Sequence, residues 1–174
     1  PRVVEVLLTA NLPTAERFPP WEALYVLLER KDLLLFAGEL AYLVGGAILP
    51  RLPSRYLPTE KEKLKEDAAK YEELLLQVLQ RMREAEEAGV IQREAYLGTL
   101  RRLAGALHVP TSQADRPWTF LGGEAIHLGP GPWLFLSEEA VRLGDAGLAK
   151  VILERLPEEF RPPALEAWAG SMEE

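Results

Sequence analysis

A long seam of apolar residues in the middle of the chain constrains its fold more than any other feature. Between residues 59 and 88, apolar side chains recur at alternating spacings of four and three, at Leu64, Ala68, Tyr71, Leu75, Val78, Met82 and Ala85. This spacing lines one face of an α-helix. Leu74, Leu76 and Leu79 widen that face beyond the seam of a two-stranded coiled coil. The segment is therefore predicted to be a helix buried in a bundle.

A second helix is predicted to follow almost at once. Gly89 suits the left-handed backbone position that often ends a helix. From residue 92 to 107 an apolar stripe recurs at Tyr96, Leu100, Leu103 and Leu107. Because the connection is so short, the two helices are expected to form an antiparallel hairpin. The sequence around Gly89 resembles the short helical-hairpin modules found at the ends of many bacterial proteins, a resemblance that implies no particular function.

Two other apolar segments precede this hairpin. Residues 3–8 are β-branched and short, which predicts a strand. Residues 33–49 are predicted to form a buried core helix rather than a membrane span, because the run is short and contains Glu39. Glu39 either faces water, pairs with Arg51 or Arg55, or contacts a partner chain.

The last third of the chain is predicted to contain a small sheet. Residues 118–121, 124–128 and 132–137 are short apolar segments separated by Gly122-Gly123 and by Gly129-Pro130-Gly131, which favour hairpin turns. Ser137, followed by two glutamates, predicts the start of a helix. A last short helix is expected after Pro162-Pro163.

The predicted fold is α+β and predominantly α, a helical bundle built on a long antiparallel helical hairpin, with a small antiparallel β-hairpin or sheet near the C-terminal third. We expect a single domain over residues 1–174. Residues 1–58 would supply the N-terminal strand and apolar helices, residues 59–108 the helical hairpin, and residues 109–174 the β-hairpin and C-terminal helices.

Composition narrows the functional classes. The chain has 174 residues and no cysteine, which excludes disulfides, thiolate metal sites and a cysteine nucleophile. Its net charge of -7 disfavours broad binding to nucleic acid. Few asparagines and methionines beside many charged residues are typical of thermophile proteins. With no signal peptide and no membrane segment expected, the protein is predicted to be cytoplasmic.

Sequence motifs for common chemistries are sparse. There are two histidines, and no metal-binding His-Glu spacing, Walker loop or dinucleotide fingerprint, so neither metal nor cofactor is expected. Arg102 and His108 are the candidate catalytic pair. Their order and spacing resemble the Arg and His of HEPN-type ribonucleases, a resemblance that implies RNA cleavage by proton transfer at His108 and phosphate stabilisation by Arg102. Alternatively, Arg102 is a surface residue and His108 favours the helix dipole.

Two further hypotheses concern partners. Arg93, Arg101 and Arg102 on one predicted helix, followed by a β-hairpin, are the outline of a winged-helix, nucleic-acid-associated accessory protein or regulator. The alternative is a charged face paired with the many glutamates. The acidic net charge of the chain does not favour binding to nucleic acid.

Aromatic residues concentrate in the predicted β-hairpin, at Trp118, Phe120, Trp133 and Phe135. They are either core or, together with Glu39, a candidate interface for a protein partner or for self-association. The balance of these patterns favours a non-enzymatic interaction, assembly or adaptor protein.

Overall fold

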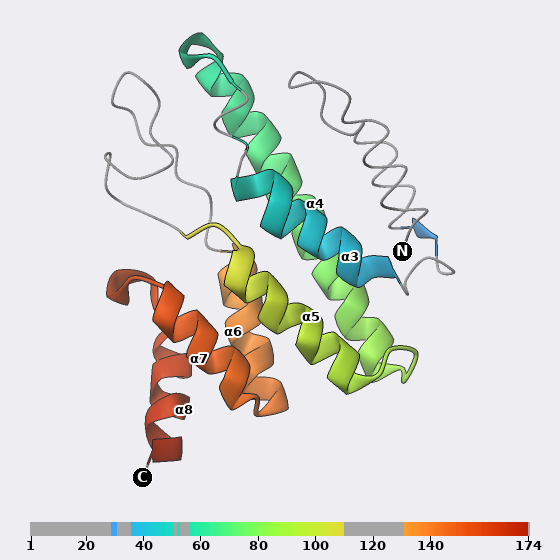
Figure 1. Ribbon diagram of the computed structural model, residues 1–174, viewed down its shortest axis with the longest axis vertical. Helices are drawn as coiled ribbons and strands as arrows, with labels where there is room; N and C mark the ends of the chain where they lie inside the picture. The colour runs from blue at the N-terminus through green and yellow to red at the C-terminus, as the bar shows by residue number, and fades with distance from the viewer. Residues whose placement is uncertain (1–28, 31–35, 51, 53–55, 110–130, 174) are drawn as a thin grey trace.

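The computed structural model describes residues 29–30, 36–50, 52, 56–109 and 131–173. All regular structure within these ranges is helical (Figure 1). The α-helices are α3 (Ala37–Tyr42), α4 (Lys61–Glu87), α5 (Arg93–Ala106), α6 (Gly131–Leu143), α7 (Ala146–Arg155) and α8 (Pro163–Glu173). Short turns of π- or 3-10 helix occur at Leu43–Ile48, Pro58–Glu60 and Glu158–Phe160.

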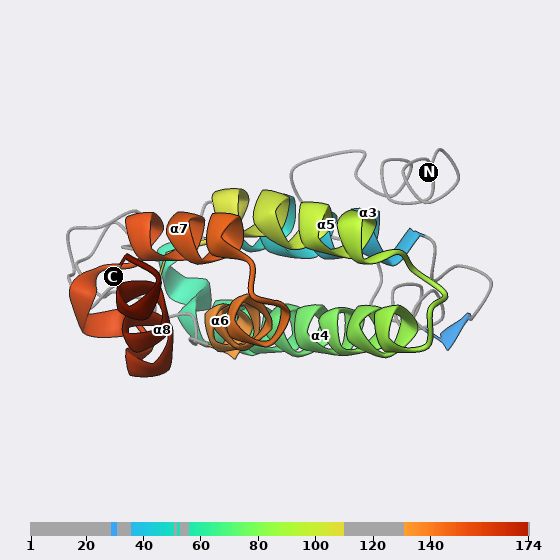
Figure 2. The ribbon, with the colours of Figure 1, turned by 90° about the horizontal axis from the view of Figure 1, so that it is seen from below.

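The helices form two layers, which Figure 2 shows from the side. Helices α3, α5 and α7 lie in one layer, and α4 and α6 lie in the other with α8 at the end of the row. Helix α4 packs against α3 and α5, and α6 packs against α5 and α7. A continuous apolar core therefore fills the space between the layers.

The predicted helical hairpin is confirmed by α4 and α5. Apolar seam residues of α4 are buried, including Leu64, Leu75 and Met82. Gly89 has a φ of 74°, and the Val90 N–H donates to the carbonyl of Ala85, which completes the expected helix end. The burial of Leu74 and Leu79 confirms that α4 lies inside a bundle.

The predicted core helix at residues 33–49 is confirmed over α3 and the π-helical turn that follows. Gly45 lies in that turn, and a Cβ built on it would be 2.6 Å from Leu103 Cδ1 and 2.9 Å from Leu75 Cδ2. Glycine therefore lets the turn approach both α4 and α5 closely. Among the residues described, none of the helices combines the length and the apolar character needed to cross a membrane.

The predicted strand at residues 132–137 is wrong, because this segment is the first half of α6. An unbroken apolar run does not distinguish a buried strand from a buried helix. The burial pattern follows helical spacing: Trp133, Leu136 and Ala140 are buried, while Leu134 and Val141 are exposed.

The helix begins at the Gly-Pro pair, since proline is compatible with a first helical turn. Ser137 does not cap it, and its hydroxyl instead donates to the carbonyl of Trp133 one turn back. The α+β prediction is therefore corrected to an all-helical bundle for the described residues. The segments 3–8, 118–121 and 124–128, which were predicted as strands, lie outside those residues.

The close packing at Gly45 leads to a prediction about stability. Gly45→Val should lower the free energy of unfolding by about 1–3 kcal/mol, because buried Leu75 and Leu103 must move to admit the side chain. Gly98→Val on α5 is the matched control, since a Cβ there meets no atom within 4 Å, and it should change stability by less than about 0.5 kcal/mol. Urea unfolding measures both. Equal stability of the two variants would contradict the close approach.

Candidate functional site

A groove of about 790 Å³ lies between α7 and α8. Its apolar lining includes Ala149, Leu153, Trp168 and Met172. Met172 is 58% exposed. We call this feature the α7–α8 groove. Concave, mainly apolar surfaces of this kind bind ligands or partner side chains.

Charged residues of both signs surround the apolar lining of the groove. Lys150 and Glu154 come from α7, Glu166 from α8, and Arg161 from the turn between these helices. Lys150 Nζ lies 3.8 Å from Glu154 Oε1, a long and solvent-exposed ion pair that contributes little to stability. The rim can therefore rearrange to meet a partner at little cost.

Two arginine contacts fix α7, the wall of the groove, against α5. At its start, Arg101 donates to both carboxylate oxygens of Asp145 at 2.7 and 2.8 Å, while Asp145 also accepts from the Leu148 N–H and caps α7. Hydrogen bonds from Arg101 hold the pKa of Asp145 below its ordinary value. At its end, Arg155 donates to the carbonyls of Ala104 and Leu107 at the end of α5. The position of the α7 wall is therefore well defined.

Helix α8, the other wall, is held less deeply. Among its described side chains only Leu165 is buried. Trp168 is half-buried against the core, and Ala164, Ala167 and Met172 are exposed. A helix with so many apolar residues outside the core presents surface that water does not solvate well.

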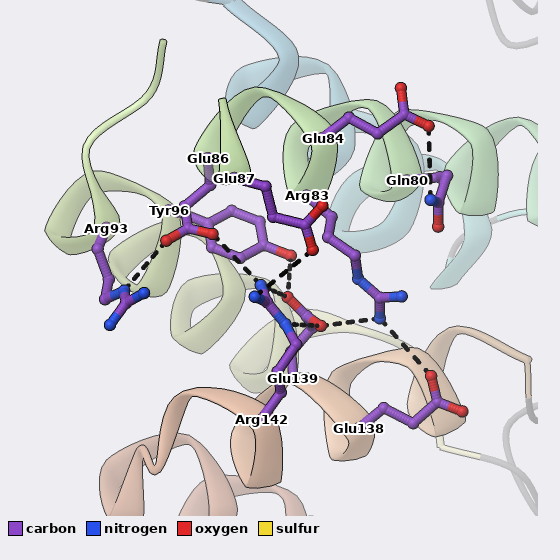
Figure 3. A network of polar contacts seen from close by, with 10 residues as sticks. All are labelled: Gln80, Arg83, Glu84, Glu86, Glu87, Arg93, Tyr96, Glu138, Glu139 and Arg142. Atoms are coloured by element: carbon purple, nitrogen blue, oxygen red, sulfur yellow. Dashed lines mark hydrogen bonds and ion pairs between the residues drawn. The ribbon is translucent and has the colours of Figure 1, made fainter. Parts of the chain in front are cut away.

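A second polar cluster lies at the junction of α4, α5 and α6 (Figure 3). Glu139 on α6 has no solvent exposure, and its carboxylate receives a hydrogen bond of 2.5 Å from the Tyr96 hydroxyl. Arg142 donates to both Glu139 oxygens at 2.7 and 2.9 Å, and Arg83 lies 2.8 Å from Glu139 Oε1. We call these four residues the Glu139 cluster. One buried carboxylate thus joins three helices.

The cluster favours the ionised form of Glu139. Burial alone would raise the pKa of this carboxyl, but hydrogen bonds from Arg142 and Tyr96 and the charge of Arg83 lower it below its ordinary value. Burial and the hydrogen bond to Glu139 raise the pKa of the Tyr96 hydroxyl, so tyrosine stays protonated and donates.

The Glu139 cluster continues toward the surface through glutamates on α4. Arg142 also reaches Glu86 and Glu87 at 3.3 and 3.6 Å, and Glu86 in turn accepts from Arg93 at 3.0 Å. Each of these cations therefore has a carboxylate partner, as Figure 3 shows. The arrangement joins the three helices at this junction, and Arg83 Nε is the buried atom of the cluster that has no hydrogen-bond partner.

The structure gives the two candidate catalytic residues separate partners. The guanidinium of Arg102 lies 3.8 Å from the centre of the Tyr42 ring on α3. His108 is buried, with Nε2 3.3 Å from Glu72 Oε1 on α4 and its carbonyl accepting from the Trp133 indole. Neither contact joins Arg102 to His108. These contacts place Arg102 against α3 and His108 against α4, and the ribonuclease pair stays a prediction.

The three arginines proposed as a nucleic-acid face point to different neighbours. Arg93 pairs with Glu86 on α4, Arg101 with Asp145 at the start of α7, and Arg102 stacks on Tyr42 of α3. They pair mostly with acidic groups rather than forming one basic patch. The strand that would belong to the wing is helical, so the described residues contain no wing.

The structure describes three of the five residues predicted to form an interface. Trp133 and Phe135 are buried in the core, and the ring of Phe135 lies beneath Arg83 at 4.2 Å. Trp118 and Phe120 lie outside the described residues. Glu39 is exposed on α3, while Arg51 and Arg55, its proposed partners, are outside the described residues.

Sequence reasoning missed both the Glu139 cluster and the α7–α8 groove. The sequence pattern places Glu139 only at the start of a helix, because it predicts a strand at residues 132–137. With a helix starting at Gly131, Glu139 falls in phase with Pro132 and Phe135, and a glutamate on a buried face signals a cationic partner. The groove carried a weaker signal, the alanine-rich sequence of α8 with Trp168 and Met172.

Comparisons with known protein families, curated proteins and solved structures found no match to this chain. Among the described residues, no group of three histidine or carboxylate side chains is arranged to hold a metal ion. The α7–α8 groove is the feature on which we base a functional proposal.

The burial of Glu139 predicts a strong effect of its removal. Glu139→Gln should lower the free energy of unfolding by about 3 kcal/mol, because Arg83 and Arg142 lose their shared carboxylate. Glu138→Gln is the control: this neighbour is 72% exposed and pairs with Arg83 at 3.6 Å. It should cost less than about 1 kcal/mol. Similar losses in the two variants, measured by urea unfolding, would contradict a central role for Glu139.

The lowered pKa of Glu139 also predicts a pH dependence. The unfolded chain binds a proton at the ordinary glutamate pKa of about 4.3, and the folded protein binds it only at lower pH. The stabilisation is therefore present above that value and is lost as the pH falls below it. Unfolding curves between about pH 6 and pH 3 should show the difference between wild type and Glu139→Gln shrinking with falling pH. A constant difference would show that ionisation of Glu139 is not its source.

Proposed function

We propose that this chain is a non-enzymatic interaction module, acting in assembly or as an adaptor, and that it binds an apolar helix of a partner polypeptide in the α7–α8 groove. The observation that carries the proposal is the groove itself, with exposed Met172 and half-buried Trp168 along its apolar lining. Amphipathic helices bind in such grooves through apolar residues spaced three and four apart.

The surroundings of the groove support a binding role. The α7 wall is held at both ends by Arg101 and Arg155, so a partner would meet a preformed surface. Methionine and tryptophan are enriched at interfaces because they bury a large area and adapt to the partner. The rim charges supply polar contacts around an apolar centre, which is the usual anatomy of an interface.

Site-specific photo-crosslinking tests this function. Met172→p-benzoylphenylalanine, expressed in cells of the native host, should yield discrete polypeptide adducts on irradiation. Val90→p-benzoylphenylalanine is a matched control, because Val90 is 59% exposed and lies at the α4–α5 turn, outside the groove. Adducts at position 90 equal to those at position 172, or none at either, would reject the groove as a binding site.

A charge placed in the groove provides a second arm of the same test. Ala146→Glu should abolish the adducts at position 172, because Ala146 lines the groove and an unpaired carboxylate there disfavours an apolar partner. The substitution lies in the first turn of α7, where a negative charge favours the helix, so folding should be retained. Ala95→Glu in the first turn of α5 is the control and should leave the adducts unchanged. Adducts that persist in Ala146→Glu would mean that the partner binds elsewhere.

A further inference from the structure

We propose that Met172 is a site of reversible oxidation by peroxide, and that its conversion to the sulfoxide closes the α7–α8 groove to an apolar partner. The effect on binding rests on the proposed function, whereas the oxidation of Met172 does not depend on it. Oxidation turns a flexible apolar side chain into a polar one, and this change matters most where the side chain lines a binding surface.

Met172 carries the accessible sulfur of the chain. The sequence contains two methionines and no cysteine, so two thioethers are its only sulfur groups. Met82 on α4 is 1% exposed within the core, whereas Met172 on α8 is 58% exposed. Oxidation depends on exposure, because the peroxide must reach the sulfur atom. A peroxide therefore acts on one of the two thioethers of the folded chain and spares the other.

The oxidation transfers one oxygen atom from the peroxide to the Met172 sulfur. A sulfur lone pair attacks hydrogen peroxide, the O–O bond breaks as the S–O bond forms, and the second oxygen leaves with both protons as water. Sulfur is oxidised by two electrons and the peroxide is reduced by two. Methionine sulfoxide reductases reverse the step: two thiols form a disulfide, and the sulfoxide oxygen leaves as water. Because the chain has no cysteine, these thiols belong to the reductase.

The sulfoxide would introduce a strong hydrogen-bond acceptor into the apolar lining of the groove. Met172 follows Trp168 by four residues on α8, which places both on one face of the helix, and both line the groove with Leu153 and Ala149 of α7. Water solvates the sulfoxide oxygen while the groove is open. An apolar helix bound there would remove that water and supply no donor in its place. Oxidation therefore disfavours the bound state relative to the free state.

The same geometry makes the effect reciprocal. A partner that covers the apolar lining also covers the Met172 sulfur, so the peroxide reaches this atom only in the free chain. Two events that exclude each other at one site are linked, and each weakens the other to the same extent. A bound partner should therefore slow the oxidation of Met172.

Peroxide treatment of the purified full chain tests the oxidation site. Peptide mass spectrometry should show one added oxygen at least about tenfold faster at Met172 than at Met82, given their exposed fractions of 58% and 1%. The two rates should become equal in urea, where the fold no longer protects Met82. Methionine sulfoxide reductases for both sulfoxide epimers, with a dithiol, should restore the original mass. Equal rates in the folded chain, or a product that the reductases leave unchanged, would overturn the reversible site.

Crosslinking from a second position in the groove tests the effect on binding. Lys150→p-benzoylphenylalanine leaves Met172 in place, and Lys150 is exposed and lines the groove. The purified variant is oxidised, freed of peroxide, added to an extract of host cells and irradiated. Its adducts should fall at least about fivefold relative to the untreated variant, because the sulfoxide loses its hydrogen bonds on binding. Treatment with the reductases should restore the adducts.

Two substitutions in the same crosslinking chain serve as controls. Met172→Leu keeps an apolar side chain without a sulfur atom, so its adducts should be equal before and after peroxide treatment. Met172→Gln has similar length and a polar end, so its adducts should be low without peroxide. Circular dichroism and urea unfolding should show the oxidised chain folded, because Met172 lies outside the buried core.

The outcomes separate the oxidation switch from the proposed function. Adducts that survive full conversion of Met172, or that peroxide also removes from the Met172→Leu chain, would overturn the closing of the groove and leave the interaction function standing. The absence of adducts from the untreated chain would reject the proposed function and with it the closing of the groove. The oxidation site itself is decided by the mass spectrometry of the purified chain.

Discussion

The bundle depends on one buried carboxylate that is shared by three helices. Glu139 receives hydrogen bonds from Tyr96 on α5 and from Arg142 on its own helix, and it pairs with Arg83 on α4. A fully buried carboxylate is tolerated only when its hydrogen-bond and ion-pair partners are close and well directed. The Glu139 cluster therefore contributes, together with buried Trp133 and Leu136, to the register of α6 against α4 and α5. Helices α7 and α8, and with them the groove, follow from the position of α6.

The fold was predictable from sequence where periodicity is long and caps are clear. The α4–α5 hairpin followed from the seam that runs through Leu64, Leu75 and Met82 and from Gly89 at its end, and the core helix containing Gly45 followed from its apolar composition. These elements extend over enough turns that the helical spacing of their apolar residues can be distinguished from a chance pattern. They also agree with their tertiary environment, since the face predicted to be apolar is the one that is buried.

The failure at residues 132–137 has a physical cause. A run of six residues with one proline and several large apolar side chains fits a strand buried on both faces as well as a helix buried on most of its surface. The helix is stabilised by contacts with residues far from the run: Tyr96 hydrogen-bonds Glu139, and the carbonyl of His108 accepts from the Trp133 indole. Such long-range partners cannot be read from local pattern. The groove was hidden for the same reason, because its walls are brought together by contacts of α7 and α8 with α6.

Arg155 on α7 hydrogen-bonds the end of α5 and so links the two halves of the bundle. Its guanidinium hydrogen-bonds the carbonyls of Ala104 and Leu107 and lies 5.6 Å from the centre of the Trp133 ring, so the last turn of α5 is closed by a side chain from α7. The C-cap residue of α5, Leu107, has an apolar side chain that cannot donate such hydrogen bonds. The last turn of α5 therefore takes two of its hydrogen bonds from a residue that lies far later in the chain. Assembly of the two halves is in this sense cooperative, because the second half supplies the hydrogen-bond donors that the first half lacks.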